Sequence, residues 1–111
     1  MTLFIDYIRL ARAYYKADES FDKKSTEDVN RIYNELSVVY AEIKKLDKLD
    51  ELSSLIDHEE EAVALWASTH CLPYFTDRAK ERLKRLSRNS TFLGFDAEMV
   101  LKEWEKGRLK V

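Results

Sequence analysis

Asp96 and Glu98 lie two residues apart near the end of the chain, within the stretch TFLGFDAEMVLKEW. Two carboxylates can act as a general acid and a general base when both face one substrate. Residues two positions apart on a helix point in different directions, so this pair does not meet that requirement. Because an apolar turn follows, Asp96 is instead typical of a helix N-cap whose carboxylate accepts amides near Met99. Gly94 is expected to adopt a backbone shape, with positive φ, that folds Phe95 back onto the core.

His58 is followed by three glutamates, Glu59, Glu60 and Glu61. Metal ligands on one helix need a spacing of three or four residues, and only His58 with Glu61 has that spacing. A metalloprotease motif would place a second histidine at position 62, which is an alanine here. Asp57 can cap the amide of Glu60, and the glutamates suit the positive end of a helix. The sequence therefore favours a helix start over a metal site and predicts neither a metal nor a cofactor.

His70 and Cys71 are adjacent in the sequence. A nucleophile and its base must converge, whereas neighbouring residues on a helix point about 100° apart. A small buried thiol is therefore expected at Cys71. A single cysteine cannot form an internal disulfide, which fits a reducing compartment. With no phosphate-binding loop and no complete catalytic set, the sequence predicts no catalytic residues and a protein that is not an enzyme.

The charge of the sequence is unevenly distributed. Residues 25–61 carry eleven acids against four bases, a net of −7, and residues 77–88 carry six bases against two acids, a net of +4. The basic run lacks interleaved aromatic residues, so it favours a solvated face or a partner of the acidic helices over nucleic-acid binding. The acidic stretch indicates either charge balance within the chain or a charged docking face. The basic residues are Arg78, Lys80, Arg82, Lys84, Arg85 and Arg88.

The elements that position these residues are predicted to be helices. The chain has 111 residues, of which 45% are hydrophobic and 36% charged, as is typical of one globular domain. Two glycines and one proline are too few for strands joined by tight turns. Charges interrupt the apolar residues of the N-terminus, and no run of about 18 apolar residues occurs. The sequence therefore predicts a soluble, cytoplasmic, all-α protein with neither a signal peptide nor a membrane span.

Six helices are expected, of which the first covers residues 3–17. Its apolar face consists of Phe4, Tyr7, Ile8, Ala11, Tyr14 and Tyr15. The long second helix starts at a capping box formed by Ser25 and Asp28. Its seam, which packs within the chain or forms a dimer, consists of Val29, Ile32, Leu36, Val39, Ile43 and Leu46. A monomer or a weak dimer is therefore expected.

The other four helices are short. The register breaks between residues 46 and 50, and a separate third helix carries Leu49, Leu52, Leu55 and Ile56. The fourth helix is apolar over residues 62–67 and is expected to be enclosed on most sides, and Pro73 either ends it or opens the next loop. The fifth is capped by Thr76 and turns three residues inward, Ala79, Leu83 and Leu86. After a loop at residues 89–95, the sixth covers residues 97–106 and ends at Gly107 in a left-handed turn.

Trp66 and Trp104 each lie on an apolar helical face. Packing in the core is the expected role of both, although either one would be a strong binding hot spot if it were exposed.

The second half of the chain resembles a family of small bacterial proteins known as a domain of unknown function. The resemblance covers residues 50–109, in LIDHEEEAVALWASTHCLPYFTDRAKERLKRLS and LGFDAEMVLKEWEKGRL, whereas upstream only the helical outline is similar. The glutamates after His58 depart from the family, where many relatives look turn-like. The positions that match the family pattern are Asp57, His58, Ala67, His70, Pro73, Gly94, Asp96, Ala97, Met99 and Leu101.

The resemblance implies a single all-α domain over residues 1–111, a HEAT/armadillo-like α-α superhelix. Some relatives are immunity proteins that accompany the toxins of contact-dependent growth-inhibition systems, where the toxin is often an RNase. The resemblance therefore implies a non-catalytic protein that binds a cognate toxin and occludes its active site. The alternative is a helical scaffold or adaptor for protein–protein interaction.

A toxin that grips RNA is basic where it binds phosphate, so an inhibitor benefits from an acidic docking face. The expected partner is such a toxin domain, with no direct contact to nucleic acid or to a membrane. The candidate partner-binding residues are Asp50, Glu51, Asp57, His58, Glu59, Glu60, Glu61, Asp96, Glu98 and Glu103.

Overall fold

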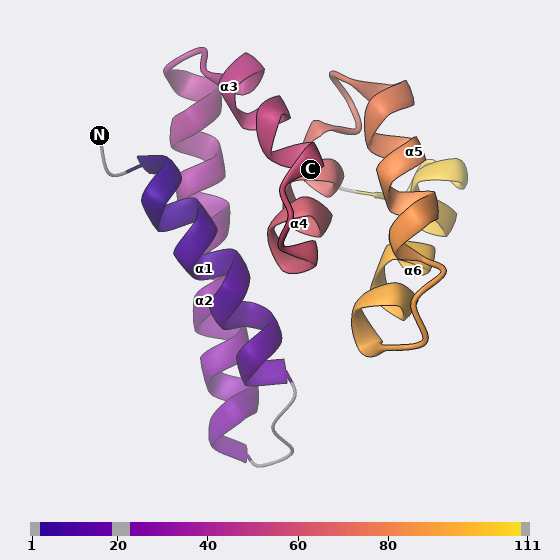
Figure 1. The fold of residues 1–111 in the computed structure, drawn as a ribbon. Coiled ribbons are helices and arrows are strands. Elements are labelled where there is room, and N and C mark those ends of the chain that lie inside the picture. Colours follow the sequence, from indigo (N-terminus) through magenta and orange to yellow (C-terminus); the bar gives the residue numbers. More distant parts are fainter. Residues whose placement is uncertain (1–2, 19–22, 110–111) are drawn as a thin grey trace. The chain divides into compact units, whose positions relative to one another are not determined.

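The protein is all-α, as predicted. The computed structural model describes residues 3–18 and 23–109, and these residues form six α-helices and one 3-10 helix, with no strand among them (Figure 1). The chain divides into a first unit, residues 1–49, and a second unit, residues 50–111. The arrangement of the helices as one superhelix stays a prediction.

The first unit is a pair of helices that run in opposite directions side by side, α1 (Leu3–Asp18) and α2 (Lys23–Lys45) (Figure 1). On α1, the predicted face is confirmed at its centre, because Tyr7 and Ala11 are fully buried. Leu10 is buried as well, although the spacing did not single it out. The predicted capping box of Ser25 and Asp28 lies outside the described side chains, and α2 already begins at Lys23.

The buried stripe of α2 follows the seam only in part. Ile32, Leu36 and Ile43 are buried as predicted. Tyr40 is buried where the heptad spacing pointed to Val39, because a straight α-helix advances 3.6 rather than 3.5 residues per turn. Leu46 is about half exposed, since it lies just beyond the last residue of the helix.

The predicted break after residue 46 is confirmed as a left-handed helix end. Asp47 has a φ of 58°, and its amide donates to the carbonyl of Lys44 over 3.1 Å. The amide of Lys48 donates to the carbonyl of Ile43 over 3.0 Å. This pair of hydrogen bonds is the Schellman motif, which satisfies carbonyls that the end of a helix leaves without intrahelical donors.

The second unit contains α3 (Leu49–Ser53), which begins at the last residue of the first unit, η1 (Ser54–Asp57), α4 (Glu61–Cys71), α5 (Thr76–Leu86) and α6 (Phe92–Glu105). Helices α4, α5 and α6 pack against one another, and α4 and α5 both contact η1. As predicted, α4 is enclosed on most sides, with Val63, Ala64, Leu65 and residues 67–71 buried. The predicted inward residues of α5 are confirmed as Ala79, Leu83 and Leu86.

Two helix starts differ from the predictions. Thr76 is the first residue of α5 rather than its cap, and its hydroxyl donates to the carbonyl of Leu72 over 2.7 Å. Helix α6 begins at Phe92, five residues before the predicted start, with Thr91 as its N-cap. The hydroxyl of Thr91 accepts the amide of Gly94 over 3.4 Å. Threonine is a favoured N-cap residue, so this earlier start was compatible with the sequence.

Gly94 and Phe95 therefore have other roles than expected. The only glycine with positive φ among the described residues is Gly107, at 71°, where the predicted left-handed end of α6 is confirmed. Gly94 is buried in the first turn of α6, and a Cβ placed on it would lie 2.0 Å from the carbonyl oxygen of Asn89. Phe95 is 59% exposed instead of packed in the core. Gly94 is thus required for close approach to the end of the preceding loop.

We expect Gly94→Ala to lower the free energy of unfolding by about 2 kcal/mol or more, because backbone atoms of Asn89 have to move. In a helix with free space the same change is stabilising by about 1 kcal/mol, so the sign of the effect is diagnostic. Urea unfolding followed by circular dichroism measures it, with Phe95→Ala on the exposed side of the same helix as the control. A stabilised Gly94→Ala protein contradicts the close approach.

We expect Asp47→Gly to be more stable than Asp47→Ala by about 1 kcal/mol, because only glycine adopts positive φ without a Cβ penalty. The same urea unfolding measurement compares the two variants. Equal stability contradicts the left-handed conformation at this position.

Candidate functional site

Six carboxylates fall within twelve residues at the start of the second unit. We call residues 50–61 the acidic segment; it contains no lysine or arginine, and its acids are Asp50, Glu51, Asp57, Glu59, Glu60 and Glu61. The segment covers most of α3, all of η1 and the first residue of α4. Such a density of like charge is unfavourable unless cations lie close by or the carboxylates extend into water.

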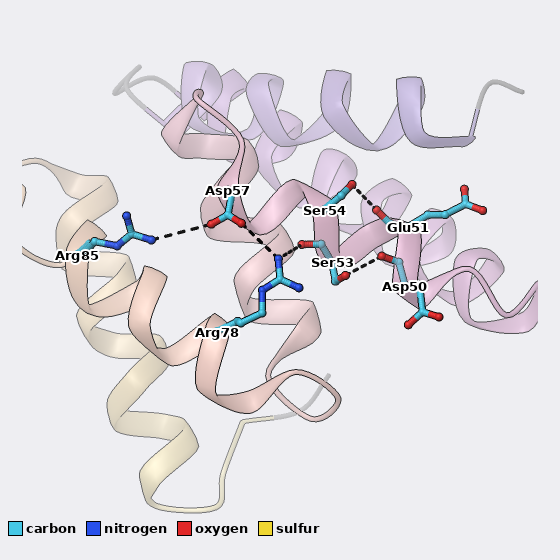
Figure 2. A network of polar contacts seen from close by, with 7 residues as sticks. All are labelled: Asp50, Glu51, Ser53, Ser54, Asp57, Arg78 and Arg85. Atoms are coloured by element: carbon cyan, nitrogen blue, oxygen red, sulfur yellow. Dashed lines mark hydrogen bonds and ion pairs between the residues drawn. The ribbon is translucent and has the colours of Figure 1, made fainter.

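Asp57 lies between two arginines of α5 (Figure 2). Its Oδ2 accepts a hydrogen bond from Nη2 of Arg78 over 3.3 Å, and its Oδ1 lies 4.0 Å from Nη2 of Arg85. Nη2 of Arg78 also donates to the carbonyl of Ser53 over 3.2 Å. The predicted cap of Glu60 by Asp57 is therefore wrong, because this carboxylate is held by α5 instead.

His58 takes the role that was expected of Asp57. Its Nδ1 accepts the amide of Glu60 over 3.0 Å, just before α4 begins. Its carbonyl accepts a hydrogen bond from Nη2 of Arg82 over 3.2 Å. Since Nδ1 is an acceptor here, the proton of the neutral ring lies on Nε2. Both contacts fix the turn into α4, so the structure gives His58 a positioning role in this turn.

The remaining acids of the segment differ in their surroundings. Glu61 accepts a hydrogen bond from Nδ2 of Asn89. Asp50, Glu51 and Glu59 are exposed, and the carboxylates of Asp50 and Glu59 form no ion pair with any residue that the structure describes. The hydroxyls of Ser53 and Ser54 donate to the backbone carbonyls of Asp50 and Glu51, respectively (Figure 2). These hydrogen bonds link the backbone at the two acids to the residues three positions later.

The arginines that hold the segment share one side of α5. Arg78, Arg82 and Arg85 follow a spacing of four and three residues, so they lie above one another on the helix. Lys80 and Lys84 fall on a different side by the same helical geometry, whereas Arg88 lies beyond the last residue of the helix. The sequence predicted a solvated face or a partner of the acidic helices. The structure shows that Arg78 and Arg85 contact the carboxylate of Asp57, whereas Arg82 contacts the backbone of the acidic segment at His58. The spacing alone could have separated the three arginines from Lys80 and Lys84.

The three acidic candidates on α6 form short-range contacts or lie partly buried. Glu98 pairs with Lys102 over 3.1 Å, and Glu103 pairs with Arg108 over 3.3 Å. Both pairs are largely exposed, so each contributes at most about 1 kcal/mol to stability. Asp96 is half-buried in the second turn of α6, where it is not the N-cap.

The sequence interpretation of Cys71 as a small buried thiol is confirmed. The side chain is fully buried, and burial raises the pKa of Cys71 to about 12, although Arg78 opposes the shift. His70 is buried beside it, with its ring 5.4 Å from the ring of Trp66. Trp66 and Trp104 are half-buried, so each is partly in the core and partly accessible.

Among the described residues, no group of three or more histidine, cysteine, aspartate or glutamate side chains is arranged to hold a metal ion. None of the helices formed by these residues has the length and apolar character that a membrane crossing needs.

Comparisons with known proteins do not identify the chain. No family model, curated protein or solved structure matches it. The resemblance of residues 50–109 to the bacterial helical family therefore stays a prediction.

We expect the protein to lose stability as the pH rises above about 9. The thiolate of Cys71 forms readily in the unfolded chain, near the ordinary value of 9.0, but only near 12 in the folded protein. Above pH 9 the folded state therefore binds more protons than the unfolded state, and the free energy of unfolding falls by about 1 kcal/mol between pH 8 and pH 10.

Urea unfolding of the wild type and of Cys71→Ala at both pH values isolates this contribution, because all other titrating groups are common to the two proteins. The wild type should lose about 1 kcal/mol more than the variant. Parallel losses contradict the assignment to Cys71.

Proposed function

We propose that this protein is an immunity protein that binds a cognate toxin, a basic nuclease of a contact-dependent growth-inhibition system, and occludes its active site. The resemblance of residues 50–109 to a family with such members supports the proposal. The observation that carries it is the exposure of acids that the fold itself does not use.

The acidic segment divides into structural and available carboxylates. Asp57 is held by Arg78 and Arg85, and Glu61 is held by Asn89. Asp50 and Glu59 have no such partner among the described residues, and both are exposed. Acids that do not stabilise their own chain still generate a negative potential at the surface. That potential is complementary to the basic groove with which a nuclease binds phosphate.

Occlusion requires binding but no chemistry on the part of the inhibitor. A protein that covers the phosphate-binding groove excludes the nucleic acid from the same cations. Complementary charge accelerates the encounter of the two proteins, and this acceleration weakens as salt screens the charges. The exposed acids should therefore increase both the affinity for the toxin and the salt dependence of that affinity.

An immunity gene is expected to follow the gene of its toxin directly, so the probe is the nuclease domain of a toxin encoded there. We expect the triple substitution Asp50→Asn, Glu51→Gln and Glu59→Gln to weaken binding to this domain by about tenfold, and to reduce its salt dependence. These changes remove charge and nearly preserve shape. Surface plasmon resonance between 50 and 300 mM salt measures both quantities, and an RNA-cleavage assay measures inhibition.

Glu35→Gln and Glu81→Gln are the matched controls, since both residues are exposed acids outside the acidic segment. Unchanged affinity and unchanged salt dependence in the triple variant refute the acidic docking face. Absence of binding and inhibition by the wild type refutes the immunity function.

A further inference from the structure

Helix α6 buries its small residues fully and Leu93, Val100, Leu101 and Trp104 in part, but it exposes three large apolar residues. Its buried residues are Gly94 and Ala97. Phe92 is 57% exposed, Phe95 is 59% exposed and Met99 is 37% exposed. An amphipathic helix in a globular unit normally buries its large apolar side chains, so the exposed ones on α6 require an explanation.

The three exposed residues form one stripe. Their spacing of three and four residues places Phe92, Phe95 and Met99 on a single side of α6. Ala97, two residues from Phe95, points about 200° away from it at 100° per residue, towards the interior. We call this stripe the outward face of α6. Single exposed apolar residues are ordinary, but a continuous stripe bordered by polar residues is typical of an interaction site.

Acidic residues border the stripe on both sides. Helix α6 carries four acids and a single base, a net of −3. By helical geometry, Asp96 and Glu103 lie along one side of the stripe, and Glu98 and Glu105 lie along the other. Two of these acids have cations beside them, because Lys102 lies 3.1 Å from Glu98 and Arg108, beyond the end of the helix, lies 3.3 Å from Glu103. The four acids and these two bases leave the border with a net charge of −2.

We propose that the outward face of α6 is a docking surface for a basic protein that inserts apolar side chains between Phe92, Phe95 and Met99. The charge of the border selects this occupant. Lysines and arginines around an apolar contact complement acids on both sides. Two copies of α6 placed face to face bring acids against acids, and an anionic membrane repels the same border.

The stripe and its border contribute differently to binding. Large aromatic side chains that become buried at the centre of an interface supply most of its affinity, and a flexible methionine adapts to the opposing surface. The acids around them increase the association rate and exclude acidic partners. The identity of the partner as a basic nuclease rests on the proposed function. The chemistry of the surface does not depend on it.

The decisive variants are Phe95→Ala, Met99→Ala and the double substitution, in the full chain. Both residues are exposed, so the fold should tolerate the change, and urea unfolding checks this. The matched controls are Ile5→Ala and Val38→Ala, which alter apolar residues of the first unit that are 66% and 69% exposed. Binding is measured by fluorescence anisotropy with two kinds of probe. The first is the nuclease domain of a toxin encoded directly upstream. The second is a set of two helical peptides that are tested separately, one of leucine and lysine and one of leucine and glutamate.

If the nuclease domain binds the wild type, we expect each single variant to weaken binding by about tenfold and the controls to leave it unchanged. Unchanged binding by the double variant overturns the docking surface, although the immunity function then stands.

If the nuclease domain does not bind, the proposed function fails and the peptides decide the surface. Binding of the leucine–lysine peptide in preference to the leucine–glutamate peptide, weakened by the double variant, supports the surface. No preference, or no effect of the variant, overturns it. Self-association in analytical ultracentrifugation that the double variant abolishes overturns it as well, because the occupant is then a second copy.

Discussion

The ion pairs of Asp57 with α5 fix the start of the second unit. Arg78 joins the carboxylate of Asp57 to the carbonyl of Ser53, and Arg82 holds the carbonyl of His58. The charges are about half exposed, so each pair alone is worth at most about 1 kcal/mol. Their combined effect is geometric, because three side chains from one side of a helix hold successive parts of an acid-rich turn.

This arrangement determines which acids remain for other uses. Asp57 and Glu61 are oriented towards contacts within the unit, whereas Asp50 and Glu59 extend from it. A surface formed in this way keeps a fixed backbone beneath its charges, and a rigid surface loses less conformational entropy when it binds a partner. The acidic segment can therefore be both a structural element and a binding surface.

The contact at Gly94 has a comparable influence on α6. A Cβ at this position would collide with the carbonyl of Asn89, so the first turn of α6 lies close to the loop that precedes it, and the fully buried residues of the helix are Gly94 and Ala97. Leu93, Val100, Leu101 and Trp104 lie on the same side as Ala97 and are partly buried. Phe95 and Met99 are consequently on the opposite side, where they are exposed.

The sequence by itself determined the all-α class, the inward residues of α5, the buried thiol of Cys71 and the left-handed end at Gly107. Each of these follows from local propensity or from helical spacing within one element. Only the tertiary structure decided that His58 and not Asp57 caps the turn, because Asp57 pairs with an arginine 21 residues away. It also decided that Phe95 is exposed, since the side that α6 buries depends on a contact of Gly94 with the preceding loop. Spacing along one helix carries no information about which neighbour approaches it, and that is why these features required the fold.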